Sequence, residues 1–89
     1  MIITTKHFVE RVNERYITNK TDKLDYILST FTDIYKKYKK NKISLNIKRE
    51  YRNNSIRYII YYYDFKYIYT EENDSIILIS FWIRNKYFF

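Results

Sequence analysis

The sequence predicts an α+β domain in which two N-terminal helices pack on a four-stranded antiparallel sheet. Three observations lead to this prediction. Apolar residues recur with helical spacing in the first 40 residues, the period changes to strand-like alternation afterwards, and short polar turns separate the strand-like segments. Short connections join neighbouring antiparallel strands, and helices that precede such a sheet cover one of its faces. With 89 residues, the chain is expected to form a single domain over 1–89.

Both helices show apolar stripes. The first is expected over 6–17, with Thr4 or Thr5 as its N-cap. The second is expected over 22–40, where apolar residues keep the helical period for four turns. Acidic residues stand at its start and lysines at its end, an arrangement that the helix dipole favours.

In the rest of the chain, side chains of different character alternate as they do in β-strands. Strands are expected over 43–51, 55–63, 66–71 and 75–84, with turns at 52–54, 64–65 and 72–74. The second and fourth of these strands are apolar on both faces. The sheet face away from the helices is therefore expected to be a groove, a partner surface or a tyrosine-lined platform.

Composition excludes several classes of site. The chain contains no Gly, Pro or Cys and one His, whereas it contains 12 Tyr. It can therefore form no disulfide, thiol nucleophile, cysteine-type zinc site, His-cluster metal site or glycine-rich phosphate loop, and no metal or cofactor is expected. No segment is apolar for long enough to span a membrane, and the N-terminus lacks a signal-peptide core. We expect a cytoplasmic protein without a membrane partner.

Positive charge is concentrated in one part of the chain. The formal net charge is +7, and residues 36–57 hold nine basic residues against Glu50 alone. Cations with interleaved aromatics are typical of nucleic-acid binding, and exposed tyrosines favour unpaired RNA over duplex DNA. The candidate binding residues are Lys36, Lys37, Lys39, Lys40, Lys48, Arg49, Tyr51, Arg52, Arg57 and Arg84. The alternative is a solvated helix end followed by an ordinary edge strand, where lysines discourage further pairing.

A second candidate site lies on the first helix. His7, Arg11 and Arg15 are four residues apart and share one helical face beside the apolar stripe. Arg offers a fork for phosphate, and His exchanges protons near neutral pH. In the alternative interpretation, Glu10 and Glu14 pair with basic residues of the same helix, and the stripe has no catalytic role.

The segment TKHFVERVNERYI at 5–17 carries an H-x3-R-x2-E-R pattern and resembles the opening helix of RelE/ParE-like toxins. This resemblance implies the fold described above and places His7, Arg11 and Arg15 at a functional site. The group includes ribonucleases that cut mRNA or tRNA without a metal, as well as members that do not cut. In the ribonucleases, basic and tyrosine side chains of the sheet complete the site. The local candidates are Arg49, Arg57, Ser80 and Arg84.

Three functions remain open from the sequence. The first is a RelE-like RNA-binding domain, with or without metal-independent ribonuclease activity on tRNA or mRNA. In the cleaving form, Arg11 and Arg15 would hold phosphates, and His7 or a sheet tyrosine would act as acid or base. The second is a phage-encoded, anti-CRISPR-like inhibitor that binds a host defence or RNA-handling complex without catalysis. AT-rich codons dominate the composition, as in low-GC bacteria and their phages. The third is a toxin whose antitoxin covers the basic groove.

Overall fold

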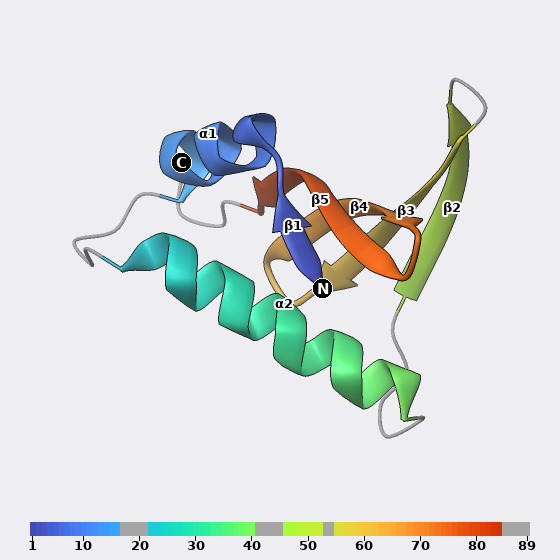
Figure 1. Ribbon diagram of the computed structural model, residues 1–89. Helices are drawn as coiled ribbons and strands as arrows, with labels where there is room; N and C mark the ends of the chain where they lie inside the picture. The colour runs from blue at the N-terminus through green and yellow to red at the C-terminus, as the bar shows by residue number, and fades with distance from the viewer. Residues whose placement is uncertain (17–21, 41–45, 53–54, 85–89) are drawn as a thin grey trace.

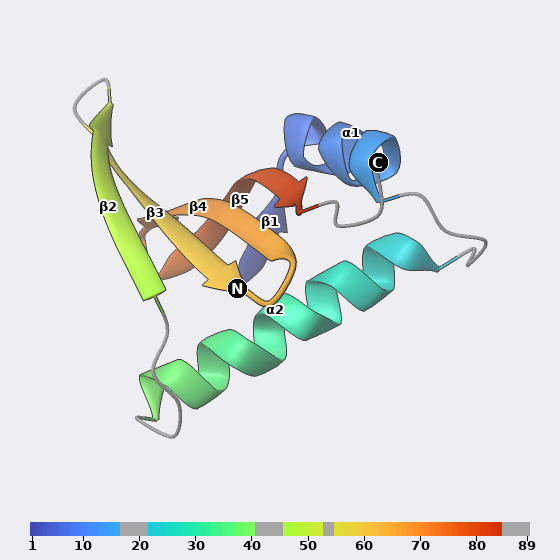
Figure 2. The same cartoon turned by 180° about the vertical axis from the view of Figure 1, so that it is seen from behind.

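A computed structural model describes residues 1–16, 22–40, 46–52 and 55–84. Figures 1 and 2 show two helices beside a twisted sheet. The elements are β1 (Ile2–Thr4), α1 (Lys6–Arg15), α2 (Lys23–Lys39), β2 (Asn46–Arg52), β3 (Ser55–Tyr62), β4 (Phe65–Glu72) and β5 (Ser75–Ile83). The predicted residue 17 of the first helix, residues 43–45 of the first strand and turn residues 53–54 lie outside the described residues.

The prediction of a four-stranded antiparallel sheet is wrong. Within the described residues the sheet has five strands in the order β1-β5-β4-β3-β2, and β1 pairs with β5 in parallel, with Ile2 opposite Ile76. The sheet is therefore mixed, while the α+β class and the two helices agree with the prediction. The four strands after the helices do form an antiparallel meander. A strand of three residues is too short to show alternation in the sequence, which explains why β1 was missed.

Thr5 joins β1 to α1. Its backbone N–H donates to Leu78 O at 3.2 Å, which extends the contact between β1 and β5 by one residue. Its side-chain oxygen donates to the same carbonyl at 2.9 Å and accepts from the N–H of Phe8 at 3.1 Å. Thr5 is thus the predicted N-cap of α1, and it also fixes the start of that helix to β5.

The core lies between the helices and one face of the sheet. Fully buried side chains come from α1 (Phe8, Val12), from α2 (Ile27, Phe31, Ile34) and from strands β3 to β5 (Ile60, Tyr67, Tyr69, Leu78, Phe81). Tyr67 and Tyr69 are the largest of them, and the hydroxyl of Tyr67 donates to Ile27 O at 3.0 Å. Burial raises the pKa of Tyr67 because an ionised phenol would lose its hydration.

Two hairpin turns use positive φ angles without glycine. Asn73 and Asp74, with φ of 49° and 63°, join β4 to β5, and asparagine and aspartate tolerate this conformation. Tyr63, with φ of 51°, precedes Asp64 in the turn between β3 and β4. The turn expected at 64–65 therefore lies one residue earlier, at 63–64, because Tyr62 pairs with Phe65.

No described element covers the second face of the sheet. Alternate residues of the strands point to it, among them Lys48, Ile59, Tyr61, Lys66, Ile68 and Trp82, as the register across β2 to β5 shows. We call this the uncovered face. The pairing of β4 with β5 contains a β-bulge. Ile68 pairs with Ser80 and Tyr69 pairs with Leu78, so Ile79 lies between two paired residues of β5. From Tyr69 onwards the register between the two strands is therefore shifted by one residue.

Candidate nucleic-acid interface

Cations and aromatic rings alternate across one end of the uncovered face. Tyr61 of β3 lies opposite Lys66 of β4, and Lys66 lies opposite Trp82 of β5. Lys48 of β2 stands beyond Tyr61, and Arg15 at the end of α1 stands beyond Trp82. We call these five residues the cation–aromatic row: Lys48, Tyr61, Lys66, Trp82 and Arg15. Four strands and one helix contribute to it, so the register of the sheet brings together residues that are far apart in the sequence.

Close contacts link the members of the row. The Nζ atoms of Lys48 and Lys66 lie 5.5 and 5.7 Å from the ring centroid of Tyr61. The Nζ atom of Lys66 also lies 5.9 Å from the Trp82 ring. These distances fall within the range of cation–π attraction, so each ring helps to hold a positive charge at the surface. The rings stay accessible, since Tyr61 is 36% and Trp82 46% exposed.

Arg15 anchors one end of the row. Its Cζ atom lies 3.3 Å from the Trp82 ring centroid, and Nη1 donates to Phe81 O at 2.7 Å. Phe81 lies beyond the residues of β5 that β1 pairs with. Arg15 therefore satisfies a strand carbonyl where β1 has ended. Partial burial lowers the pKa of the Arg15 guanidinium, the charge of Arg11 lowers it further, and Glu14 opposes both effects.

The other two residues of the predicted helical stripe do not join the row. Arg11 is paired within α1, because its Nη1 lies 2.7 Å from Glu14 Oε2. His7 is exposed in the first turn of α1, eight residues before Arg15, which corresponds to about 12 Å along a helix. The pairing of Arg11 with Glu14 agrees with the alternative interpretation of this stripe. Arg15 alone of the three contacts a residue of the uncovered face in the described part of the chain.

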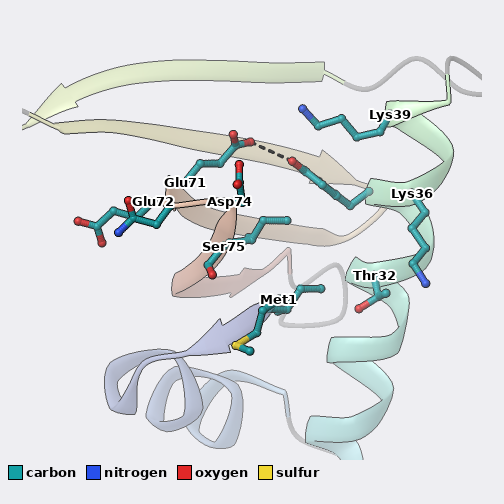
Figure 3. A pocket seen from close by; sticks show the side chains of 12 residues that line it. Met1, Thr32, Lys36, Lys39, Glu71, Glu72, Asp74 and Ser75 are labelled. Carbon is teal, nitrogen blue, oxygen red and sulfur yellow. Dashed lines mark hydrogen bonds between the residues drawn. The ribbon is translucent and has the colours of Figure 1, made fainter.

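The predicted basic block is divided by the fold. Lys36, Lys37, Lys39 and Lys40 stand at the end of α2, on the helix side of the sheet. Lys37 pairs with Asp33 across one helical turn, with an N–O distance of 3.0 Å. Lys36 and Lys39 line a hollow of about 650 Å³ between α2 and the β4–β5 turn, together with three acidic residues, Glu71, Glu72 and Asp74. Figure 3 shows these charges around the hydrogen bond from the Tyr35 hydroxyl to Glu71, which measures 2.9 Å. The carboxylates offset the lysines, so this end of the block offers little net attraction to phosphate.

Strand alternation separates the remaining candidates. Lys48 belongs to the uncovered face, whereas Arg49 turns to the helix side, where its Cζ atom lies 5.9 Å from the Tyr58 ring centroid. Tyr51 follows Arg49 on that side. Arg57 lies on the uncovered face opposite Glu50, and its buried Nε has no hydrogen-bond partner among the described residues. The side chain of Arg52 lies outside the described part of the structure.

Beside Trp82 the uncovered face is hollowed. A concavity of about 500 Å³ opens at the β3–β4 turn, and we call it the outer hollow. Its lining includes Tyr61, Tyr63, Lys66, Trp82 and Arg84. The backbone N–H of Arg84 donates to Asp64 O at 2.6 Å, which holds the end of β5 against the turn. Of the predicted residues, Lys48 and Arg15 therefore belong to the row, and Arg84 lines the hollow beside it. Ser80, a candidate from the resemblance, is buried in the sheet and is 7% exposed.

Tyr61, Lys66 and Trp82 were not predicted as site residues. The sequence held the information needed to group them, because two-residue hairpins fix which residues of neighbouring strands face one another. In the described part of the chain, no helix is both long and apolar enough to cross a membrane, and no three His, Cys, Asp or Glu side chains gather as metal ligands would. No known protein family, curated protein or solved structure matches this chain at a significant level.

Proposed function

We propose that this protein binds unpaired RNA on the uncovered face of its sheet. The observation that supports this most directly is the cation–aromatic row. Aromatic faces stack on unpaired bases, and neighbouring cations attract the phosphates that link them. In the row, two accessible rings alternate with three cations at contact distance, which is the combination that a single strand requires.

The spacing of the row suits a flexible strand. Tyr61 and Trp82 stand on strands that are separated by β4, so their backbones are about 10 Å apart. Lys66 lies between them. A phosphate over Lys66 would be flanked by bases on either ring. A duplex has its bases paired and stacked already and could not use the rings, so single strands are favoured.

The geometry supports binding of a strand rather than its cleavage with His7 as the acid or base. Acid–base catalysis needs a proton-transferring group beside the phosphate-binding groups. His7 is exposed about two helical turns from Arg15, and Arg11 is engaged by Glu14. The basic and aromatic groups that do gather are suited to holding a strand.

Fluorescence anisotropy of a labelled, mixed-sequence single-stranded RNA tests this proposal. The wild-type protein is expected to bind the single strand more tightly than the same sequence in a duplex. Trp82→Ala is expected to weaken binding by about ten-fold, since stacking of one base contributes about 1–3 kcal/mol. Tyr51→Ala is the matched control, because Tyr51 is 80% exposed but lies on the other side of the sheet. Equal affinity for both RNA forms, or equal losses in both variants, would contradict the proposal.

A further inference from the structure

Tyr63 occupies an unfavourable backbone position. Its φ of 51° lies in the left-handed region, where a bulky residue with a Cβ atom is strained. The neighbouring β4–β5 hairpin places Asn73 and Asp74 at such angles, which are residues that tolerate them. Tyr63 is also 89% exposed, so burial in the core does not compensate for the strain. An aromatic residue at this position therefore calls for an explanation outside folding.

The position of Tyr63 between two hollows supplies such an explanation. On one side the residue lines the outer hollow, with Tyr61, Lys66 and Trp82. On the other side it lines a second concavity of about 310 Å³, which we call the tyrosine hollow, together with Tyr16, Tyr26 and Tyr62. The turn at Tyr63 thus separates a hollow on the uncovered face from a hollow on the helix side.

The turn is held in place on both sides. The Tyr63 and Tyr62 rings meet edge to face, with centroids 4.6 Å apart and planes at 78°. The hydrogen bond from Arg84 N to Asp64 O fixes the residue that follows. Behind the tyrosine hollow, the rings of Tyr16 and Tyr26 stack on each other at 6.2 Å, and each meets Phe65 at a steep angle. Both walls are therefore preformed, and an entering base would need little reordering of side chains.

From this arrangement we infer that Tyr63 separates two consecutive bases of the bound RNA strand. One base enters the outer hollow beside Trp82, the next enters the tyrosine hollow, and the strand bends over the β3–β4 turn. Lys66 and Arg84 line the outer hollow and offer cations to the phosphate there. The inference rests on the proposed function and adds a strand path and a residue that positions the bases.

Tyr63→Asn tests this inference, because asparagine removes the ring and also accepts a left-handed φ. The variant is expected to melt at a higher temperature than the wild type while binding single-stranded RNA about ten-fold more weakly. Tyr63→Phe is expected to keep the wild-type affinity, since stacking needs the ring and not the hydroxyl. Tyr51→Asn removes an exposed tyrosine from the other side of the sheet and is expected to leave the affinity unchanged.

The outcomes separate this inference from the function on which it rests. If Tyr63→Asn binds as tightly as the wild type while Trp82→Ala does not, the inference fails and the proposed function stands. If the wild type binds no single-stranded RNA, the proposed function fails and the inference falls with it. If Tyr63→Asn does not fold, Tyr63→Gly replaces it, because glycine takes this φ freely, and the same ten-fold loss is expected.

Discussion

The guanidinium of Arg15 lies over the indole of Trp82, with Cζ 3.3 Å from the ring centroid. Its Nη1 donates to Phe81 O at the same time. One side chain therefore connects the end of α1, the part of β5 beyond its pairing with β1, and an exposed ring of the candidate site. The contact matters for the fold as well as for the function that we propose, and the two roles can be tested separately.

Arg15→Lys keeps the charge but loses the planar fork that both contacts need. We expect the free energy of unfolding to fall by about 1–2 kcal/mol, from the weakened hydrogen bond and cation–π contact. Urea denaturation measures this change. Arg11→Lys is the control, because Arg11 forms a solvent-accessible pair with Glu14, and such pairs contribute little. Equal stability of both variants would show that the contacts of Arg15 do not stabilise the fold.

Lys66→Ala removes the cation between the two rings of the row. We expect the affinity for single-stranded RNA to fall and the slope of log K against log salt concentration to become shallower by about 0.7, the value for one phosphate contact to a single strand. Lys37→Ala is the control for lost charge, since Lys37 is paired with Asp33 on α2. A variant at Lys66 with an unchanged salt slope would mean that this lysine holds no phosphate.

His7→Ala tests the catalytic role that the resemblance to RelE-like ribonucleases implies. His7 is exposed and apart from the row, so the variant is expected to bind RNA as the wild type does. With purified protein, the length of a labelled RNA is expected to stay unchanged during incubation with either form. Cleavage by the wild type that disappears in the variant would establish His7 as a catalytic residue.

Tyr67→Phe removes one hydroxyl from the core. That hydroxyl donates to Ile27 O at 3.0 Å and ties β4 to α2. The expected loss in the free energy of unfolding is about 1 kcal/mol, the usual net contribution of such a bond. Thermal unfolding of the variant, compared with Tyr51→Phe on the surface, measures it. A Tyr67→Phe variant as stable as the wild type would show that the hydrogen bond adds nothing net.

Two buried tyrosines and one half-buried tyrosine predict a loss of stability at alkaline pH. Burial raises the pKa of Tyr35, Tyr67 and Tyr69, and the hydrogen bond to Glu71 adds to the effect at Tyr35. In the unfolded chain these phenols titrate near pH ~10. Below that pH both states are protonated and the contribution to stability is complete. Above it only the unfolded chain loses protons, so the free energy of unfolding falls as pH rises.

Absorbance near the phenolate band follows the ionisation of tyrosines during an alkaline titration. The three with raised pKa values are expected to ionise only as the protein unfolds. A single smooth titration of all tyrosines, completed before unfolding, would contradict the packing described for Tyr67.

The sequence was sufficient to predict the elements with a clear period. The N-cap at Thr5, the apolar stripe through Ile27, Phe31 and Ile34, and the antiparallel meander all agree with the structure. The strand β1 was missed because three residues show no period. Its pairing with β5 depends on a long-range contact, and local patterns do not record such contacts.

The candidate site was predicted less well, for a physical reason. Charge density along the chain indicated a block at 36–57, but alternation sends Lys48 and Arg49 to opposite faces. The row instead depends on the register between strands, which the turn at Tyr63 and the bulge beside Tyr69 both set. The resemblance to RelE/ParE-like proteins and a host partner or antitoxin stay predictions.

Trp82 is the only tryptophan of the chain, so its fluorescence reports directly on the cation–aromatic row. Titration of the wild-type protein with single-stranded RNA at low salt is therefore the most direct test that the uncovered face binds unpaired bases. We expect saturable quenching as a base stacks against the ring, with an apparent affinity that falls steeply as salt is added. Binding detected by anisotropy with no change in Trp82 emission would place the RNA elsewhere and contradict the proposal.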